Sequence, residues 1–445
     1  MVTQREYVAD FADFIEASPT SYHAVSRIAS RLDACGFTRL REEDSWLESV
    51  RGGGFYVIRG GAVIAFMLPE EKMDASRATL RIIGSHTDSP CLKVKPEGVS
   101  FHGAFTQVDV EVYGGPLLNS WLNRDMGIAG RVVDMDGNVH LVKTPACMVL
   151  PQLAPHLIGG NRDKLEINRQ KDIHPVYTRS EDFWDLIAGS AQPVGVQGSN
   201  ASEIKVDGLR ASDIAGHDLH SYCVEPPHVN GSYFSSGRQD NLVSVFASMR
   251  AMEDCARSLA EGTTAIMDTA IPLFVAFDHE EVGSGTSSGA YGPFLESILR
   301  RIIGLWSQGE EAYERICARS LCVSADTGHS LNPNYPEHYD PDHPPVAGEG
   351  VLIKINALQR YASDAYGIAM LRKFAQSAGA KLQSFVSNNA IPCGTTTGPL
   401  TATRLGIPTV DVGIPLLSMH SAREISHVDD LYTMYRLCAG VWGSM

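Results

Sequence analysis

The chain has 445 residues, of which 44% are hydrophobic and 20% are charged, and its formal net charge is −15. This length exceeds one ordinary domain, and the composition is that of a globular protein rather than a disordered one. The negative charge argues against nucleic-acid binding, which requires a basic surface, and against binding to anionic membranes.

The N-terminal residues and the spacing of the cysteines indicate the expected cellular location. The first ten residues contain no basic segment followed by an apolar one, so we expect no signal peptide. No apolar run approaches the roughly 20 residues that span a bilayer, so we expect no membrane segment. The nine cysteines include no Cys-x-x-Cys pair. This spacing is typical of reduced thiols and predicts a cytoplasmic protein.

The first 90 residues predict two helices, a hairpin and one further strand. Ser18-Pro-Thr-Ser21 contains capping residues that separate the two helices. Residues 55–58 and 62–66 are apolar runs on either side of a Gly-Gly turn, which is typical of a hairpin. Residues 80–83 form a short apolar run that ends close to His86.

Residues 91–234 differ, because helical periodicity is scarce and short strand candidates take its place. Residues 108–112 have strand character, and residues 130–133 and 139–142 flank an Asp-Gly turn. The polar residues 159–172 predict an exposed loop.

After residue 237, helices and apolar strands alternate again. The predicted helices lie near residues 241–259, 285–306, 362–378 and 427–442, and the predicted strands near 271–277, 320–325, 351–356, 382–387 and 408–412. The predicted fold class is therefore α/β. One domain is expected from residues 1–90 and 235–445, interrupted by an inserted β-rich domain at residues 91–234.

Acidic and histidine residues follow several of the predicted strands. Glu280 and Glu281 come shortly after one apolar run, and burying two adjacent carboxylates requires a cation or a proton. His86 and Asp326 follow two other runs. Because open α/β sheets bind ligands beyond the carboxyl ends of their strands, we expect these side chains on one rim.

Each candidate also has an ordinary explanation. His86 and Asp88 could belong to a surface loop, or to a metal ligand oriented by a carboxylate. Asp240 could cap the helix that follows it, or could bridge two metals about 3.5–4 Å apart. Asp326 and His420 are weak signals alone. Together, these residues supply the ingredients of a two-metal hydrolase.

A series of motifs resembles the aspartyl aminopeptidase family of co-catalytic zinc peptidases. The motifs are Gly84-Ser-His-Thr-Asp-Ser-Pro90, Val112-Tyr-Gly-Gly115, Arg238-Gln-Asp-Asn-Leu242, Asp278-His-Glu-Glu-Val-Gly-Ser284, Ser324-Ala-Asp326, Asn332-Pro-Asn-Tyr335, Gln359-Arg-Tyr-Ala362, Pro392-Cys-Gly-Thr-Thr396 and Met419-His-Ser421. The resemblance extends over nearly the whole chain. It implies a three-layer αβα metallopeptidase domain with a central mixed sheet.

The resemblance also implies two Zn²⁺ ions, with Co²⁺ or Mn²⁺ as alternatives. Asp240 would bridge the two ions. His86 and Asp326 would complete one metal site, and Glu281 and His420 would complete the other.

Further roles follow from the same resemblance. Glu280 would be the general base, which takes a proton from water and passes it to the leaving amine. Asp88 would orient His86. The peptide bond between Asp240 and Asn241 is expected to be cis or strained.

The implied substrates are peptides from which the N-terminal residue is removed, with a preference for Asp or Glu. Lys354, which interrupts the apolar run 351–355, would face the side-chain pocket. The alternative is an edge-strand lysine that discourages aggregation. Tyr361 would add a hydrogen-bonding group to the pocket.

The resemblance implies a homo-oligomer. The inserted domain would lie at a dimer interface, and dimers would assemble into a tetrahedral dodecamer. His156 would reach into a neighbour's active site. It would either stabilise the tetrahedral intermediate or bind a metal in some states, and both roles stay open.

Three other functions compete with this one. The protein could be an aminopeptidase for neutral N-terminal residues, or a related dinuclear deacylase or carboxypeptidase. It could also be a scaffold or assembly protein without activity. The intact set of acids and histidines argues against the scaffold, because a protein without activity need not keep Glu280.

Overall fold

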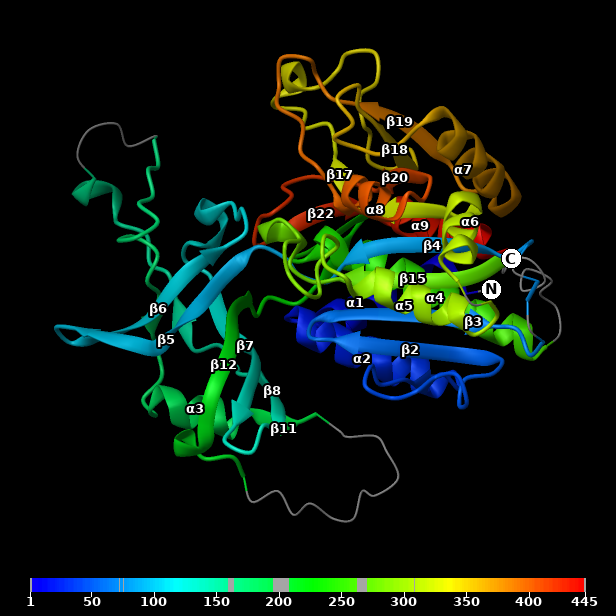
Figure 1. Ribbon diagram of the computed structural model, residues 1–445. Coiled ribbons are helices and arrows are strands. Elements are labelled where there is room, and N and C mark those ends of the chain that lie inside the picture. Colours follow the sequence, from blue (N-terminus) through cyan, green and yellow to red (C-terminus); the bar gives the residue numbers. More distant parts are fainter. Residues whose placement is uncertain are drawn as a thin grey trace.

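The computed structural model describes residues 2–71, 73–74, 76–158, 164–194, 208–261, 270–307 and 309–443. Its largest sheet has nine strands in the order β1-β2-β3-β15-β4-β16-β20-β18-β19 (Figure 1). The strands are β1 (Thr38–Arg39), β2 (Gly53–Arg59), β3 (Ala62–Leu68), β15 (Ala270–Phe277), β4 (Thr79–His86), β16 (Leu321–Ala325), β20 (Thr409–Gly413), β18 (Val351–Ile355) and β19 (Leu382–Val386). The sheet is mixed, because β15, β4, β16 and β20 pair in parallel with one another, whereas β3 is antiparallel to β15 and β18 is antiparallel to β20.

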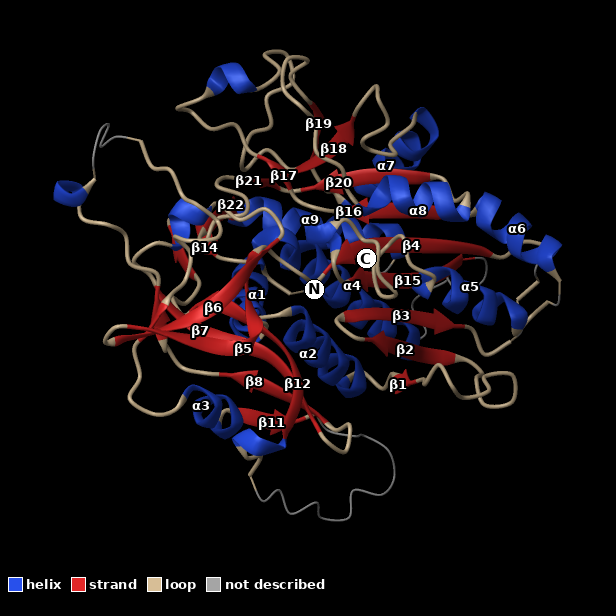
Figure 2. Ribbon diagram, turned by 60° about the vertical axis from the view of Figure 1, so that its left-hand side comes forward, coloured by secondary structure: helices blue, strands red, loops and turns tan. Residues whose placement is uncertain are grey.

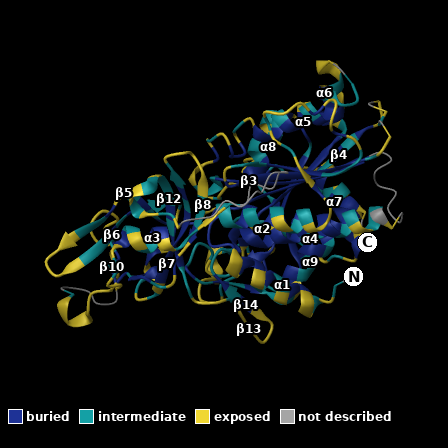
Figure 3. Cartoon of the chain, turned by 90° about the horizontal axis from the view of Figure 1, so that it is seen from below, coloured by how far each residue is buried: buried dark blue, intermediate teal, exposed yellow. Residues whose placement is uncertain are grey.

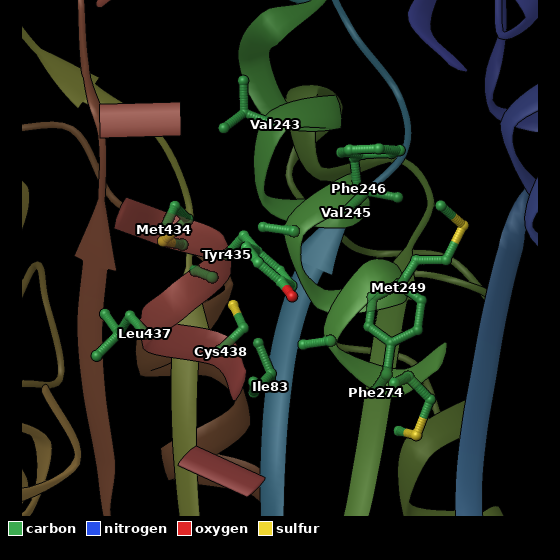
Figure 4. Close-up of a cluster of buried hydrophobic side chains, with 14 of the residues drawn as sticks. Ile83, Val243, Val245, Phe246, Met249, Phe274, Met434, Tyr435, Leu437 and Cys438 are labelled. Atoms are coloured by element: carbon green, nitrogen blue, oxygen red, sulfur yellow. The ribbon is translucent and has the colours of Figure 1, made fainter. Parts of the chain in front are cut away.

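Helices cover both faces of this sheet and give three layers (Figure 2). One face packs against α1 (Gln4–Ala17), α2 (Ser21–Ala34), α4 (Gln239–Ala260), α7 (Ala365–Ala378) and α9 (Val428–Trp442). The other packs against α5 (Phe294–Gly304), α6 (Glu310–Arg319) and α8 (Thr397–Leu405). Figure 4 shows part of the first core, where side chains of α4 and α9 gather beside Ile83 and Phe274 of the sheet.

The second large sheet comes from residues between β4 and β15. Its strands are β5 (Cys91–His102), β6 (Phe105–Tyr113), β7 (Asp125–Asp134), β8 (Val139–Lys143), β9 (Met148–Val149), β10 (Val176–Tyr177), β11 (Ala191–Pro193) and β12 (Ile214–Cys223). Their order is β11-β8-β7-β12-β5-β6-β10-β9, and β9 also pairs with β7. Six strands therefore close into a ring around a separate apolar core, and we call strands β5–β12 with their connections the barrel.

Short elements complete the fold. The barrel also contains α3 (Phe183–Gly189) and the 3-10 helices η1 (Leu118–Trp121), η2 (Pro155–Leu157) and η3 (Ala211–Asp213). The remaining 3-10 helices described are η5 (Glu280–Val282) and η6 (Pro336–His338). Two small sheets join β13 (His228–Asn230), β14 (Tyr233–Ser236) and β22 (Glu424–His427), and β17 (Gly328–His329) with β21 (Pro415–Leu416).

The end of the barrel away from the helices is the turn between β5 and β6, which is exposed (Figure 3). Phe101 and Phe105 beside this turn expose 79% and 62% of their surface. None of the helices in the described part of the chain combines the length and apolar character that crossing a bilayer requires. All nine cysteines are free thiols.

Most predicted elements are confirmed, including the two N-terminal helices and the hairpins β2–β3 and β7–β8. The helix predicted for residues 285–306 was wrong at its start, because α5 begins only at Phe294. Gly289 and Gly292 allow a tight loop there, where an added Cβ would lie 2.3 Å from Ser284 O and 2.1 Å from Thr286 O. Helices α6 and α8 were not predicted. Of the predicted loop 159–172, residues 164–172 contain no helix or strand, and the rest lies outside the described residues.

Candidate metal centre

Three neighbouring strands place acidic and histidine side chains at one edge of the nine-stranded sheet. His86 is the last residue of β4 and lies opposite Phe277 of β15. Glu280 and Glu281 follow β15 in η5. Asp326 follows β16, on the other side of β4. The rim expected from the strand ends is therefore present in the fold.

Asp240 lies between two histidines. Its Oδ1 is 3.4 Å from His86 Nε2, and its Oδ2 is 3.3 Å from His420 Nε2. Asp326 Oδ1 is also 3.4 Å from His86 Nε2, and Glu281 Oε2 is 3.5 Å from His420 Nε2. Two clusters that share one carboxylate result, and within each cluster the potential ligand atoms lie within 4.8 Å of one another.

The backbone around these residues is unusual. The Asp240–Asn241 peptide bond is cis, in line with the expectation of a cis or strained bond. Asn241 donates from Nδ2 to Ala325 O at 2.8 Å, which ties the start of α4 to the end of β16. His279 and Gly283 on either side of η5 have left-handed backbones, with φ of 64° and 94°. These turns place Glu280 and Glu281 in one short 3-10 helix.

Asp88 binds the back of the His86 ring. Its Oδ1 lies 3.3 Å from His86 Nδ1 and accepts the backbone N–H of Glu280 at 3.0 Å. Its Oδ2 accepts the backbone N–H of Glu281 at 3.1 Å and the hydroxyl of Tyr113 at 2.8 Å. Although burial opposes ionisation, the His86 and Tyr113 contacts hold the pKa of Asp88 below its usual value. Because Nδ1 faces Asp88, Nε2 of His86 is left for the cluster.

Glu424 is a site residue that the sequence interpretation missed. It is buried, and its two oxygens accept the backbone N–H groups of His420 at 2.8 Å and Asp240 at 3.1 Å. Burial and the nearby Asp240 carboxylate raise the pKa of Glu424 to about 8. The available signal was its position four residues after His420, at the start of β22.

Two carboxylate oxygens of the site have no hydrogen-bond partner among the described residues. Asp240 Oδ1 and Glu281 Oε1 are buried and have no hydrogen-bond partner. Burial and the charge of Asp240 raise the pKa of Glu281 well above its usual value. Although burial opposes it, the contact with Asp240 raises the pKa of His420 to about 10. Carboxylate and imidazole groups that crowd together, with two buried oxygens unpartnered, fit a divalent cation such as zinc, which binds these donors.

Comparison with known proteins agrees with this geometry. The family model for aminopeptidase I zinc metalloproteases (M18) matches residues 14–442. The chain belongs to the M18 family of zinc aminopeptidases. A "Probable M18 family aminopeptidase 2" of Streptomyces avermitilis is 42% identical over 437 residues, which cover 97% of this chain and 96% of the relative. One from Stutzerimonas stutzeri is 36% identical over 444 residues, 97% of each chain.

Solved structures share the fold of this M18 aminopeptidase. A chain in the cryo-EM structure of the Ape4 and Nbr1 complex has a TM-score of 0.88 and 30% identity, covering 99% of this chain and 86% of that chain. A chain in the structure of the S. cerevesiae mApe1 dodecamer has a TM-score of 0.82 and 27% identity, covering 98% of this chain and 97% of that chain.

Lys354 of the M18 aminopeptidase lies beside this centre. Its Nζ donates to Thr327 O at 2.6 Å and is 3.8 Å from Asp326 Oδ2. The same Nζ is 5.3 Å from the centre of the Tyr361 ring. Strand β18 lies between β20 and β19, and Lys354 is buried. An edge-strand lysine that protects against aggregation does not fit this position.

His156 of the M18 aminopeptidase lies apart from the other predicted site residues. It is exposed in η2 of the barrel and belongs to none of the metal-binding groups found among the described residues. The structure therefore brings together His86, Asp88, Asp240, Glu280, Glu281, Asp326, His420 and, at their side, Lys354 and Tyr361, but not His156.

Proposed function

We propose that this M18 aminopeptidase removes N-terminal residues from peptides by means of two metal ions, with a preference for Asp or Glu. The observation that carries the proposal is the position of Asp240, whose two oxygens face two different histidines at 3.4 and 3.3 Å. A carboxylate with an imidazole on each side is an arrangement that suits a bridged pair of metal ions.

The residues fit two zinc ions. His86, Asp326 and Asp240 would hold one, and Asp240, Glu281 and His420 would hold the other. The same donors also suit Co²⁺ or Mn²⁺. When bound, such ions activate water and polarise the scissile carbonyl. Elemental analysis of the purified protein tests the number, and a single ion per chain would contradict the proposal.

Glu280 is the proposed general base. It belongs to neither of the two clusters that share Asp240, although it forms a third potential group with His86 and Glu281, and its Oε2 is 4.0 Å from His86 Nε2. Its side chain is 16% exposed, compared with 4% for Glu281, so Glu280 is the glutamate that faces the open side. From there it can take a proton from water and deliver it to the leaving amine. Asp88 fixes its backbone through the N–H of Glu280.

Two glutamine variants separate these roles. Glu280→Gln should keep the metal content and lower kcat by about 10²–10⁴-fold, because general acid–base catalysis contributes roughly that much. Glu281→Gln is the matched comparison and should lower the metal content as well. Full turnover by Glu280→Gln would show that another group is the base.

Lys354 carries the proposed preference for acidic residues. Its buried ammonium lies beside Asp326 and could receive the carboxylate of an N-terminal Asp or Glu. One observation favours a neutral-residue aminopeptidase instead, because this ammonium already donates to Thr327 O and lies 3.8 Å from a carboxylate. The Tyr361 ring lies 5.3 Å from the same ammonium and would form part of the proposed pocket in either case.

A substrate panel decides between the two preferences. Lys354→Leu should lower kcat/KM for Asp- and Glu-terminal peptides by about 10–100-fold, since a hydrogen bond to a charged group contributes about 1.5–3 kcal/mol. Leu-terminal peptides are the control and should change little. An unaltered ratio of acidic to neutral substrates would remove Lys354 from the pocket and favour the neutral preference.

We also propose that residues 91–234 form a dimerisation domain inserted into a catalytic domain of residues 1–90 and 235–445. The similar structure of mApe1 is named as a dodecamer, and dimers of this chain would assemble in the same way.

His156 would then enter a neighbour's site. Leu153 and Leu157 beside it expose 56% and 69% of their surface, as an uncovered contact would. Light scattering after chromatography tests the assembly. The predicted cytoplasmic location stays a prediction.

A further inference from the structure

The segment Tyr113-Gly-Gly115 at the end of β6 belongs to the barrel but touches the metal centre of the other sheet. Tyr113 donates its hydroxyl to Asp88 Oδ2 at 2.8 Å. Gly115 O lies 3.0 Å from His420 Nδ1. Gly114 lies against Glu281, because a Cβ at this position would be 3.1 Å from Glu281 Cβ. Three successive residues of the barrel therefore contact three different residues of the centre.

On the His86 side, the contact acts through Asp88. The four groups that approach this carboxylate are the Tyr113 hydroxyl, the His86 ring and the backbone N–H groups of Glu280 and Glu281. Tyr113 is the one that comes from the barrel. Its ring is also fixed within the barrel, at 5.4 Å from the ring of His220 on β12 in an edge-on arrangement. The barrel thus determines where one oxygen of Asp88 is held.

On the His420 side, the contact is direct. Since Gly115 O accepts from Nδ1, Nε2 of His420 remains free to face Asp240 and Glu281. The loop that carries His420 is bound to the barrel at two further points. Leu117 N donates to His420 O at 2.9 Å, and Ala422 N donates to Ser120 Oγ at 2.9 Å. The ring orientation of His420 is therefore set by barrel residues.

Gly114 makes the close approach sterically feasible. Its φ of +71° lies in the left-handed region, which favours glycine. A side chain there would also meet Glu281 O at 3.4 Å and Glu281 Oε2 at 3.5 Å. An alanine at this position would require a shift of a few tenths of an ångström, either of Glu281 or of the segment that carries Gly115 O.

We infer that Tyr113-Gly-Gly115 is a positioning element through which the barrel sets the metal affinity of both halves of the centre. Tyr113 and Gly114 are positioning residues, because they act through Asp88, Glu281 and His420 rather than on the substrate. The inference rests on the proposed metal centre. Groups that orient metal ligands from behind typically change metal affinity by about 10–100-fold when they are removed.

The first test removes one hydroxyl. Tyr113→Phe in the full-length holoenzyme should lower zinc affinity by about 10-fold or more, measured by competition with a chromogenic chelator. Tyr177→Phe is the matched control, because the Tyr177 hydroxyl bonds a backbone carbonyl, Glu181 O at 3.2 Å, elsewhere in the barrel. Equal zinc affinities in the two variants would overturn the inference.

The second test adds one methyl group. Gly114→Ala should lower zinc affinity, whereas Gly137→Ala should not. Gly137 also has a left-handed backbone, with φ of +85°, but an added Cβ meets nothing within 4 Å. The backbone strain is therefore matched and the contact with Glu281 differs. If both variants bind zinc equally well, the segment does not position the ligands.

The outcome for the wild-type protein separates two kinds of failure. A wild-type chain that binds fewer than two zinc ions would contradict the proposed metal centre itself. A wild-type chain that binds two ions, with unchanged affinity in Tyr113→Phe and Gly114→Ala, would contradict the positioning role alone. Gel-filtration profiles and melting temperatures of the chelated variants check that each variant folds.

Discussion

The nine-stranded sheet and the barrel approach the candidate metal centre with different kinds of backbone. In the sheet, β4 and β15 pair in parallel without interruption from Thr79↔Ala270 to His86↔Phe277. The barrel closes through β9 and β10, which have only two residues each, and reaches the centre through the irregular segment after β6. Regular strand pairing in the nine-stranded sheet thus places the candidate ligands. The hydrogen bonds that orient these ligands from behind come partly from the less regular barrel.

The difference extends to burial. All eight residues of β15 are buried, as in a parallel strand covered by helices on both faces. In β6 only Val108 and Val110 are buried, because one face of that strand is turned outward. Substitutions and changes of conditions should therefore affect the two regions unequally.

Metal removal should have the largest effect. Dialysis against a chelator should abolish peptidase activity, because no ion then remains to activate water beside Asp240 and Glu281, each of which has one buried oxygen without a hydrogen-bond partner. Zinc at a thousand times its Kd should stabilise the folded state by about 4 kcal/mol. Calorimetry with and without zinc measures this stabilisation. After metal removal, backbone hydrogen exchange should increase more in the loop that carries His420 than in β4. Chelated protein that kept its activity would refute the metal mechanism.

A pair of core substitutions compares the two regions directly. Phe246 in the first core of the sheet and Phe183 in the barrel are both buried and both contact other aromatic rings. Replacing either by Ala should lower the free energy of unfolding by about 3–5 kcal/mol. We expect denaturation of Phe183→Ala to show the barrel unfolding before the sheet when each region is monitored by its own spectroscopic probe. Coincident transitions would mean that the two regions unfold as one unit.

A buried acid on the sheet side gives a pH dependence. Asp430 accepts the backbone N–H groups of Gly348 at 2.6 Å and Gly350 at 2.8 Å, and burial raises its pKa from 3.8 to about 6. The folded state therefore favours the protonated form. The contribution of Asp430 to stability should be complete below about pH 4 and be lost as the pH rises through about 6.

The size of this effect follows from the pKa difference. Relative to Asp430→Asn, which cannot titrate, the wild-type protein should gain up to about 3 kcal/mol between pH 7 and pH 4. Urea denaturation of both proteins at several pH values measures the difference. Parallel stability curves would show that the carboxyl group of Asp430 titrates normally.

The smallest effect is expected at an exposed ion pair of the barrel. Arg210 and Asp213 are 3.0 Å apart, and the Arg210 side chain is 78% exposed. Exposed pairs contribute little to stability because water and salt screen them. Arg210→Ala should leave the melting temperature unchanged, so a clear decrease would indicate that this part of the barrel is packed against something in solution.

Local patterns in the sequence predict the sheet and the rim well. The apolar runs before His86, Glu280 and Asp326 are strands in adjacent positions, and the carboxyl ends of parallel strands meet at one edge. The start of α5 was misplaced because Gly289 and Gly292 form close turns within a sequence that otherwise resembles a helix. Such turns depend on which carbonyl each glycine meets, and a sequence pattern does not contain that information.

The contacts behind the ligands could not be predicted. Glu424 accepts the N–H of Asp240, a residue 184 positions earlier, and Gly115 accepts from His420, 305 positions later. Closure of the barrel depends on two-residue strands that no periodicity reveals. The roles given to Lys354, Tyr361 and His156 stay predictions, because substrates and neighbouring subunits decide them.

The chain enters the barrel directly after one candidate ligand, since β5 begins five residues after His86. After β12 ends at Cys223, only the short strands β13 and β14 separate the barrel from Asp240, another candidate ligand. The barrel is therefore inserted between two candidate ligands of the proposed metal centre. Protein engineers who exchange the barrel between relatives would replace the hydroxyl behind Asp88 and the carbonyl behind His420 at the same time. A functional chimera has to retain Tyr113-Gly-Gly115 together with the acceptor at Ser120, or bring equivalents with the donated module.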